Sequence, residues 1–579
     1  MQGTPTSHNL PLRAGDFTTL VEALDYAANG ETGYNFYSGR GEIYQPLPYA
    51  VLRDEAYSLA RKLMTLDLPR GARVALIADT HPDFVRLFFA CQYAGLTPVP
   101  LPAVIQLNGK DAYIEQITRL LVDCQARIAL ATEDFMPYLA EAAQGLDIRF
   151  VGRLVDLQEL PDSKVQLQPK KANELAYLQY TSGSTRFPRG VMITQAAVCH
   201  NLKIIIQHGV QVRTGDRAVS WLPFFHDMGL VGLVLVPMAC QVSVDYLRTR
   251  DFAMRPRLWL KLLSENKGTI SFSPPFGYDL VARRLRDSDP GVYDLASWRV
   301  AGVGAEIIRP QTLDRFARQL APAGFDERAF LACYGMAECS LAVTFSPLGQ
   351  GMQVDRVDTD ELMENGRAVP VADGEETDRT TTFVKCGVLM PGYEAEIRDE
   401  QGQPLAERLC GNLYLRGSSL MSGYFGNLKL TREVLSDDGW FDTGDIAYRV
   451  GNKIVITGRA KDMIIINGRN IWPQDIEYLA ECQEEIRTGD AMAFFVHSSQ
   501  DEELAVMMVE CRLSEQQQRL DLITRLRRLI RQELGVDCVI ELVPRGTLTR
   551  TTSGKPSRHA TKKIYLEKIA STTSASELS

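Results

Sequence analysis

The spacing of apolar residues near the start of the chain alternates between helix and strand. Apolar residues recur at helical intervals over 17–28 and 49–66, and a short continuous apolar run follows at 74–77. A helix is expected over 84–93 with Gly95 as its C-cap, because glycine is the usual residue just past a helix end. Strands that alternate with helices predict parallel sheets covered by helices.

The second half of the chain has a different pattern. Over 386–424, alternating apolar residues separated by glycine turns predict a small all-β unit. Further on, the pattern predicts a helix beginning at Pro473 and an amphipathic helix over 520–534, with two strands between them (491–496 and 503–511). These last elements together predict a small α+β domain.

We therefore expect an α/β protein of two domains. At 579 residues the chain is too long for a single hydrophobic core. Residues 1–460 would form a large domain of mixed and parallel sheets flanked by helices, together with the small β subdomain. Residues 461–579 would form the α+β domain, and the serine- and threonine-rich end, 571–579, is expected to be a frayed tail.

The composition is that of a soluble globular protein, with 45% apolar and 23% charged residues. The net charge of -9, with both signs spread along the chain, argues against a nucleic-acid-binding surface. The eleven cysteines are scattered without a C-x-x-C pair, which favours a reducing cytoplasm. The sequence has no signal-peptide pattern, and its longest apolar stretch, around 230–238, is too short for a transmembrane segment. We therefore expect a cytoplasmic protein.

A loop rich in hydroxyls and glycines, residues 181–190, follows an apolar run over 175–180 that predicts a strand. Glycines let a backbone approach a phosphate closely, hydroxyls and backbone N–H groups donate to it, and arginines balance its charge. The loop is not a Walker A motif, because no lysine followed by serine or threonine stands after a glycine. An isolated loop of this kind is also typical of a polar surface turn.

Two further stretches place polar residues at the ends of apolar runs. His226 and Asp227 stand at the edge of a long apolar segment, where the alternative is a histidine satisfied inside a core. The strand expected over 298–302 ends in small residues, which would let a flat base pack against the backbone. Further on, Tyr334 offers an aromatic face and Glu338 a hard oxygen ligand for Mg²⁺.

Three charged residues complete the set of candidates. Asp445 could accept both hydroxyls of a ribose, and Arg459 offers a guanidinium to the same ribose or to an α-phosphate. Lys555 is presented by a Ser-Gly turn. Each residue alone also fits a surface turn, an ion pair or an exposed lysine, so the interpretation depends on their combination.

Taken in order, these motifs resemble the acyl-adenylate-forming superfamily of acyl-CoA ligases, luciferases and peptide-synthetase adenylation domains. The loop 181–190 resembles its phosphate loop, and Tyr-Gly-x-x-Glu at 334–338 resembles its adenine and metal site. The sequence departs from the family pattern at Arg189, Ala337 and Asn412, where lysine, threonine and glutamate are usual.

Three features resemble one branch of this superfamily, the fatty acyl-AMP ligases. They are Arg186, the stretch Leu-Pro-Phe-Phe-His-Asp-Met-Gly at 222–229, and Asn-Gly-Arg-Asn at 467–470. The branch also carries an insertion, implied here at about 354–379 within the polar, acidic segment 347–384. That segment is otherwise expected to be a long surface loop. Short apolar patches could dock the insertion on a neighbouring domain.

The resemblance implies the site residues. Catalysis would use Lys555, Glu338 and His226, with Glu338 also ligating the metal, and Lys461 would be the hinge of a mobile C-terminal domain. The residues implied to hold the nucleotide are Thr181, Ser182, Gly183, Ser184, Thr185, Gly304, Ala305, Glu306, Tyr334, Gly335, Met336, Ala337, Asp445 and Arg459. Those implied to contact the fatty acid are His226, Asp227, Met228, Gly229, Leu230, Ser273, Phe276, Tyr278 and Gly304.

The implied reaction is activation of a medium- or long-chain fatty acid with ATP and Mg²⁺ to an acyl-adenylate and pyrophosphate. The acyl group would then pass to the phosphopantetheine thiol of an acyl carrier protein or of a polyketide or peptide synthase carrier domain. Two alternatives stay open: a fatty acyl-CoA ligase, which shares the core motifs, and a non-enzymatic binder of acyl-adenylate or fatty acid. Lys555 and Glu338 argue against the binder.

Overall fold

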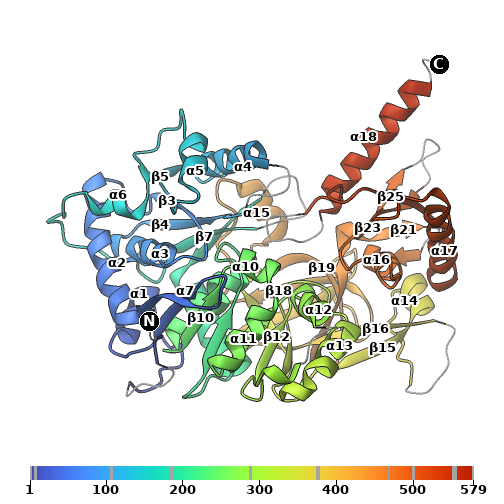
Figure 1. The fold of residues 1–579 in the computed structure, drawn as a ribbon, viewed down its shortest axis with the longest axis horizontal. Coiled ribbons are helices and arrows are strands. Elements are labelled where there is room, and N and C mark those ends of the chain that lie inside the picture. Colours follow the sequence, from blue (N-terminus) through green and yellow to red (C-terminus); the bar gives the residue numbers. More distant parts are fainter. Residues whose placement is uncertain are drawn as a thin grey trace.

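A computed structural model gives the fold of the protein (Figure 1). The described residues are 3–5, 10–104, 109–181, 188–285, 290–372, 379–466, 469–497, 503–550 and 557–576. Most of the chain forms a broad body of sheets and helices, and the last part forms a smaller body at one side of it (Figure 1). We refer to residues 464–576 as the C-terminal unit.

The largest sheet has a parallel half, whose strands follow the order β13-β12-β11-β9-β10-β1, with β2 (Ile43–Pro48) antiparallel at its edge. The strands of this half are β1 (Gly33–Tyr37), β9 (Arg217–Ser220), β10 (Ser243–Leu247), β11 (Ile270–Ser273), β12 (Val300–Val303) and β13 (Phe330–Gly335). Nearly all of their residues are buried, as expected for parallel strands covered on both faces. Because these strands run in one direction, their carboxyl ends meet at one edge of the sheet, where α/β proteins bind ligands.

The other half of the same sheet is antiparallel and follows the order β17-β18-β19-β20-β16-β14. Its strands are β14 (Ala342–Phe345), β16 (Thr380–Leu389), β17 (Tyr393–Arg398), β18 (Gly411–Gly417), β19 (Phe441–Val450) and β20 (Lys453–Arg459). The predicted small all-β unit is therefore present, but it continues the main sheet through the pairing of β13 with β14. This continuity places residues of β19 and β20 beside the carboxyl ends of the parallel strands.

A second, four-stranded parallel sheet holds β3 (Arg73–Ile77), β4 (Thr97–Leu101), β5 (Ala126–Leu130) and β6 (Phe150–Gly152). The helices expected here are confirmed as α1 (Leu20–Ala27), α2 (Tyr49–Leu63) and α3 (Pro82–Ala94). Gly95 ends α3 with φ +71°, the left-handed conformation that glycine adopts without strain. Strand β4 contains two prolines and lies at the sheet edge, where a missing N–H costs no ladder hydrogen bond.

The expectation of a long surface loop over 347–384 is wrong. The segment forms β15 (Val354–Asp358) and α14 (Thr359–Asn365), and β15 pairs antiparallel with β16. The buried carboxylate of Asp355 anchors β15, because it accepts hydrogen bonds from Arg408 at 3.1 Å and from Tyr448 at 2.8 Å. A chain that is polar in sequence is thus ordered by strand pairing and buried charge.

The C-terminal unit is an α+β body. A hairpin of β21 (Ile464–Ile466) and β22 (Arg469–Ile471) precedes α16 (Pro473–Glu481), which begins at the predicted proline. A three-stranded sheet of β23 (Ala491–His497), β24 (Glu503–Glu510) and β25 (Cys538–Val543) packs with α17 (Gln516–Leu534). Strand β25 and α18 (Arg558–Ser576) were not predicted, and α18, which projects from the body in Figure 1, corrects the expected frayed tail over 571–576.

Helix α14 bridges the two bodies. The side chain of Met363 is 2% exposed and belongs to the apolar core of the C-terminal unit, together with Ile464 and Ile471. Arg469 of β22 donates from Nε to Glu364 at 3.0 Å, and its Nη2 lies 3.4 Å from Asp360. Helix α14 therefore contacts the C-terminal unit through Met363, whereas Val357 and Leu362 pack in a separate apolar cluster with Phe383 and Tyr448.

We expect Met363→Ala to release α14 from the C-terminal unit. Truncating a buried methionine costs roughly 2–5 kcal/mol, and here the loss falls on a contact between two bodies. Hydrogen exchange of the amides over 359–365 should accelerate, whereas the matched change Met254→Ala, at a side chain 55% exposed, should leave that exchange unchanged. Unaltered exchange in Met363→Ala would show that α14 is held by other contacts.

Candidate functional site

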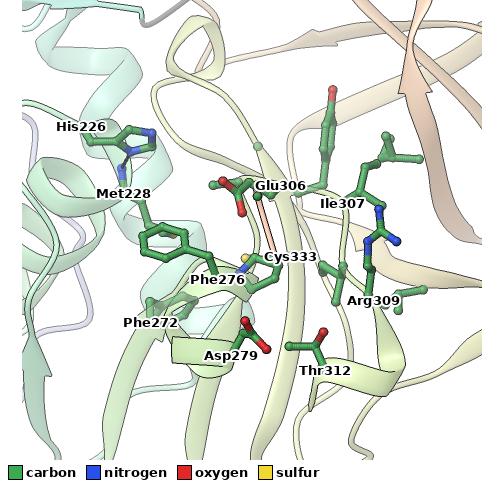
Figure 2. Close-up of a pocket in the computed structure, with 18 of the residues that line it drawn as sticks. His226, Met228, Phe272, Phe276, Asp279, Glu306, Ile307, Arg309, Thr312 and Cys333 are labelled. Carbon is green, nitrogen blue, oxygen red and sulfur yellow. Dashed lines mark hydrogen bonds between the residues drawn. The ribbon is translucent and has the colours of Figure 1, made fainter. Parts of the chain in front are cut away.

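One cavity of about 2150 Å³ lies at the carboxyl ends of the parallel strands and reaches the C-terminal unit. Its walls come from the segments that follow β9, β11, β12 and β13, from the antiparallel half of the sheet, and from α16. Figure 2 shows His226 and Met228 at one side and Ile307 and Arg309 at the other, with Phe276, Glu306 and Cys333 between them. Segments far apart in the sequence therefore line one cavity.

Asp445 is a buried carboxylate of the cavity that two neighbouring side chains hold. Tyr334, at the end of β13, donates its hydroxyl to Oδ2 of Asp445 at 2.6 Å, and Arg459 Nε lies 2.9 Å from Oδ1. Asp445 and Arg459 are opposite each other in the β19–β20 pairing, which brings the guanidinium to the carboxylate. A carboxylate has about four acceptor positions, so Asp445 can still accept ribose hydroxyls.

Glu338 lies in the turn η7 (Ala337–Cys339) that follows β13. Tyr424 donates its hydroxyl to Glu338 Oε1 at 2.9 Å, and the Met421 N–H donates to the Glu338 carbonyl at 2.8 Å. Burial raises the pKa of Glu338, although the Tyr424 hydrogen bond and the charge of Arg459 oppose the shift. A cation beside this carboxylate would offset the cost of its buried charge.

The surroundings of Glu338 fit a magnesium ion that phosphates help to coordinate. Magnesium is commonly held by one or two carboxylates together with substrate phosphates and water. Among the described ranges, no group of three or more histidine, cysteine, aspartate or glutamate side chains forms a metal cage. Glu338, a half-buried carboxylate on the wall of an open cavity, matches the first arrangement.

His226 and Asp227 lie at the start of α8 (Asp227–Leu230) and line the cavity with Met228. His226 Nδ1 lies 2.7 Å from Asp227 Oδ1, which also accepts the Met228 N–H at 2.7 Å. Gln179 of β7 (Leu175–Tyr180) donates to the Phe225 carbonyl at 2.6 Å and fixes the turn before the histidine. Asp227 therefore lies against the imidazole, and Gln179 fixes the backbone that precedes it.

The segment after β12 connects the cavity to the C-terminal unit. Ala305 has φ +68°, an uncommon conformation for a residue other than glycine, and it lines the cavity beside Glu306. Arg309 donates from Nη2 to the Gln474 carbonyl at 2.6 Å, and its guanidinium lies 4.4 Å from the ring centroid of Tyr478. A shift of this segment would therefore be transmitted to α16.

The predicted phosphate loop is a hairpin connection between β7 and β8 (Gly190–Thr194). The Thr181 N–H donates to the Arg189 carbonyl at 3.1 Å, which closes the base of the loop. Both residues line the cavity, and the Arg189 guanidinium lies 5.3 Å from the ring centroid of Tyr424. Ser182, Gly183, Ser184 and Thr185 lie outside the described residues, as does Lys555.

Behind the polar residues, the cavity has an apolar compartment along one face of the parallel strands. Strand residues Ala218, Ile270 and Phe272 form its floor. The rest of its wall comes from Ile205, Val210, Val212, Met228, Gly232, Leu233, Val236, Cys240, Val242, Phe276, Leu341, Phe345 and Val384. Two π-helical turns, η2 (Ile205–Gly209) and η3 (Val231–Leu235), supply part of this wall.

The cavity brings together many of the predicted site residues. They are Thr181, His226, Asp227, Met228, Phe276, Ala305, Glu306, Tyr334, Gly335, Met336, Ala337, Glu338, Asp445, Arg459 and Lys461. Sequence reasoning missed Tyr424, Gln179 and Arg309 as residues of the site. The Gly-Tyr pair at 423–424 was a signal, but it was assigned only to the small all-β unit.

Five predicted residues lie behind the wall and not on it: Gly229, Leu230, Ser273, Tyr278 and Gly304. Tyr278 is fully buried and donates its hydroxyl to the Gly302 carbonyl at 2.9 Å, within a cluster of aromatic rings. A Cβ on Gly229 would lie 2.0 Å from the Pro223 carbonyl oxygen. These residues shape the wall through close packing, which apolar spacing cannot distinguish from contact with a ligand.

The fold and this cavity define a member of the acyl-adenylate-forming superfamily. The sequence pattern of the AMP-binding enzyme family matches residues 25–425, so the protein belongs to that family.

The protein is similar over nearly its full length to proteins of this kind. A Caulobacter vibrioides protein named "Putative acyl-CoA synthetase" is 45% identical, with 97% of this chain and 98% of the relative covered. A medium-chain-fatty-acid–[acyl-carrier-protein] ligase of Moorena producens is 30% identical, with 95% and 96% covered. A structure from studies of fatty acyl-adenylate ligases of E. coli and L. pneumophila is 46% identical, with TM-score 0.92 and 97% and 100% covered.

We expect Glu338→Gln to stabilise the protein at neutral pH in the absence of ligands. Since burial raises the pKa of Glu338 above its value in the unfolded chain, the ionised form is disfavoured in the folded protein. In the unaltered protein, ionisation of Glu338 therefore lowers the stability of the fold. This loss accumulates as pH rises through the folded-state pKa, and it is absent below the unfolded-state pKa, about 4.3. Melting curves should show the gain at pH 7.5 and little difference at pH 4.

The control is Glu159→Gln, because Glu159 is exposed. It should change the melting temperature little at either pH. Equal melting temperatures of Glu338→Gln and the unaltered protein at pH 7.5 would contradict this prediction. They would mean that neighbouring groups stabilise the Glu338 carboxylate in the folded protein as well as water does in the unfolded chain.

Proposed function

We propose that the protein is a fatty acyl-AMP ligase. It activates a fatty acid with ATP, forming a fatty acyl-adenylate and pyrophosphate. The observation that carries this proposal is the continuity of the cavity, which joins the polar group of Glu338, Tyr334 and Asp445 to an apolar compartment suited to an alkyl chain. A mixed anhydride of a fatty acid and AMP has these two chemically different ends.

The reaction needs positioning and charge stabilisation more than acid–base catalysis. A fatty acid is already ionised at neutral pH, so its carboxylate can attack the α-phosphorus of ATP in line as pyrophosphate leaves. Asp445 and Arg459 would hold the ribose, Tyr334 would stack on adenine, and the 181–190 loop would hold the β- and γ-phosphates. His226, held by Asp227, would orient the fatty acid carboxylate at the mouth of the apolar compartment.

The resident metal of the reaction is proposed to be Mg²⁺. Glu338 would provide its protein ligand, and the bound ion would neutralise charge on the triphosphate. The hydroxyl of Tyr424 orients the carboxylate for this task. Lys555 would add a positive charge between the carboxylate and the α-phosphate oxygens.

The proposed acceptor of the acyl group is the phosphopantetheine thiol of a carrier protein. The name of the Moorena producens relative supports this choice, and the name of the Caulobacter vibrioides relative keeps CoA as the alternative acceptor. The docking of α14 favours the carrier, because it ties the C-terminal unit through Met363 and Arg469 and so restrains its movement. A CoA ligase would need a groove for a nucleotide-sized acceptor between the same two bodies.

We propose a division into domains at residues 460 and 461, with the hinge at Lys461 in the turn η8 (Ala460–Asp462). The lysine at 555 cannot serve adenylation and also leave room for an incoming thiol unless its domain moves.

The cytoplasm is the proposed location. All eleven cysteines are free thiols, and no helix among the described residues has the length and apolar character needed to cross a membrane.

The test is incubation of the purified protein with ATP, Mg²⁺ and fatty acids, followed by mass spectrometry of the products. Fatty acyl-adenylate should form without any thiol, and added CoA should yield little acyl-CoA. Rapid formation of acyl-CoA would favour the CoA ligase. Binding of acyl-adenylate without turnover would favour the non-enzymatic binder.

Lys555→Ala should reduce adenylate formation by about a hundredfold or more while leaving ATP binding nearly intact. A charge aimed at the transition state acts on the rate more than on ground-state affinity. Pyrophosphate release and calorimetric ATP binding measure the two effects separately. Lys563→Ala is the matched control on α18, where Lys563 Nζ lies 3.5 Å from Glu567 at the exposed surface. Adenylate formation at the unaltered rate in Lys555→Ala would remove Lys555 from the mechanism.

A further inference from the structure

The apolar compartment has a far end that the direction of the strands defines. His226 and Phe276, which line its mouth, follow the carboxyl ends of β9 and β11. Ala218 and Ile270 also line the compartment, but they lie near the amino ends of the same strands and are partners in the pairing of β11 with β9. Because β9 and β11 are parallel, the compartment runs along the strands from one edge of the sheet toward the other.

Four apolar residues from outside the sheet close the compartment at that end. Val210 and Val212 follow the π-helical turn η2, and Cys240 and Val242 precede β10. Three of them are almost completely buried: Val210 is 2% exposed, Cys240 is 1% exposed and Val242 is 5% exposed. Together with Ala218 and Ile270 they form a group that we call the end wall.

A buried ion pair behind the end wall holds it in place. Arg299, just before β12, donates from Nε to Asp216 Oδ1 at 2.8 Å, and the side chain of Asp216 is 2% exposed. The same guanidinium donates to the carbonyls of Val210 at 3.1 Å and Gln211 at 3.2 Å. Thr269, the residue before Ile270, donates its hydroxyl to Asp216 at 2.9 Å.

Arg299 therefore fixes the backbone of the end wall to the amino ends of two strands. A planar guanidinium that donates hydrogen bonds to one carboxylate and two carbonyls holds these groups in a fixed geometry. Gln211 has φ +48°, a left-handed conformation that this clamp maintains in a residue other than glycine. Movement of Val210 into or out of the compartment would require breaking these contacts.

We propose that the end wall, held by the Arg299–Asp216 pair, sets the longest acyl chain that the protein accepts and makes it selective for medium-chain fatty acids. This inference rests on the proposed function. Neither residue touches the substrate, so Arg299 and Asp216 are positioning residues, whereas Val210, Ala218 and Ile270 contact the end of the chain.

The strand geometry supports a medium chain. From Ile270 to Ser273 the rise is about 10 Å, at about 3.3 Å per residue. Three bonds of an extended backbone span about 3.3–3.6 Å, so this length holds about eight carbon–carbon bonds of an extended alkyl chain. The mouth at Phe276 and His226 adds a few bonds more, which gives acids of roughly ten to twelve carbons.

The test is the specificity constant for adenylate formation, measured by pyrophosphate release with saturated acids of six to eighteen carbons. With the unaltered protein, the specificity constant should rise about three- to fourfold for each added methylene, up to about ten to twelve carbons. This factor corresponds to the free energy gained by burying one methylene group. Beyond that length it should fall at least tenfold by sixteen carbons. Equal activity with sixteen- and twelve-carbon acids would overturn the proposal.

Variants at the end wall should move this optimum in opposite directions. Ala218→Leu fills the end and should shift the optimum down by about two carbons or more. Val210→Ala opens the end and should shift it upward. Arg299→Ala should raise activity with acids longer than the optimum, because the wall loses its clamp.

The matched control is Arg328→Ala, which breaks an ion pair with Asp326 at the exposed surface. It should leave the chain-length profile unchanged. Ala218→Val, with a smaller added volume, and Val210→Ala keep the test decisive if Ala218→Leu does not fold, as judged by its melting curve.

The outcomes separate this inference from the proposed function. Activity with short acids but the same chain-length profile in every end-wall variant would refute the inference and leave the proposed function standing. Absence of adenylate from every fatty acid with the unaltered protein would refute both. A shift of the optimum in the stated directions would support the end wall as the determinant of chain length.

Discussion

The architecture of this protein depends on the contacts of one buried carboxylate, Asp445. It accepts a hydrogen bond from Tyr334 at the end of the parallel half of the sheet and pairs with Arg459 in the antiparallel half. Arg459 is also the last residue before the turn that leads into the C-terminal unit. An unpaired carboxylate at this depth would cost several kcal/mol, so the three elements are held together by the need to satisfy it.

The cavity built around this contact separates two chemical environments. At its front, the half-buried carboxylate of Glu338 and the buried carboxylate of Asp445 carry a desolvation cost that a cation and hydroxyl donors offset. Behind them, the apolar floor of Ala218, Ile270 and Phe272 offers nothing to a charged group. A ligand with a polar head and an alkyl tail is therefore bound in a single orientation.

Contacts at two distant points join the C-terminal unit to the large body. Arg309 joins the segment after β12 to α16, and Met363 of α14 lies in the apolar core of the C-terminal unit. The first contact is polar and lies on the cavity wall. The second lies outside the cavity and combines the apolar packing of Met363 with the ion pair between Arg469 and Glu364. Rotation of the unit would have to break both, so α14 adds a cost that is independent of what the cavity contains.

The sequence by itself determined the local features of the fold and the order of the motifs. Helix α3 ends at Gly95 and α16 begins at Pro473 because these residues act through their own backbone conformation. The loop between β7 and β8 was likewise evident, since a strand followed by glycines and hydroxyls is a local pattern. It was the combination of this loop with the motifs that follow it in order, as far as Lys555, that indicated the superfamily.

Only the tertiary structure decided which side chains face the cavity. Tyr424 reaches Glu338 from 86 positions away, and Arg299 clamps Val210 across a separation of 89, contacts that no local spacing can report. Tyr278 and Phe276 lie two residues apart in one helix, yet only Phe276 lines the cavity. The physical reason is that apolar spacing shows which face of an element is buried, whereas strand register and packing partners decide whether it meets a ligand or the core.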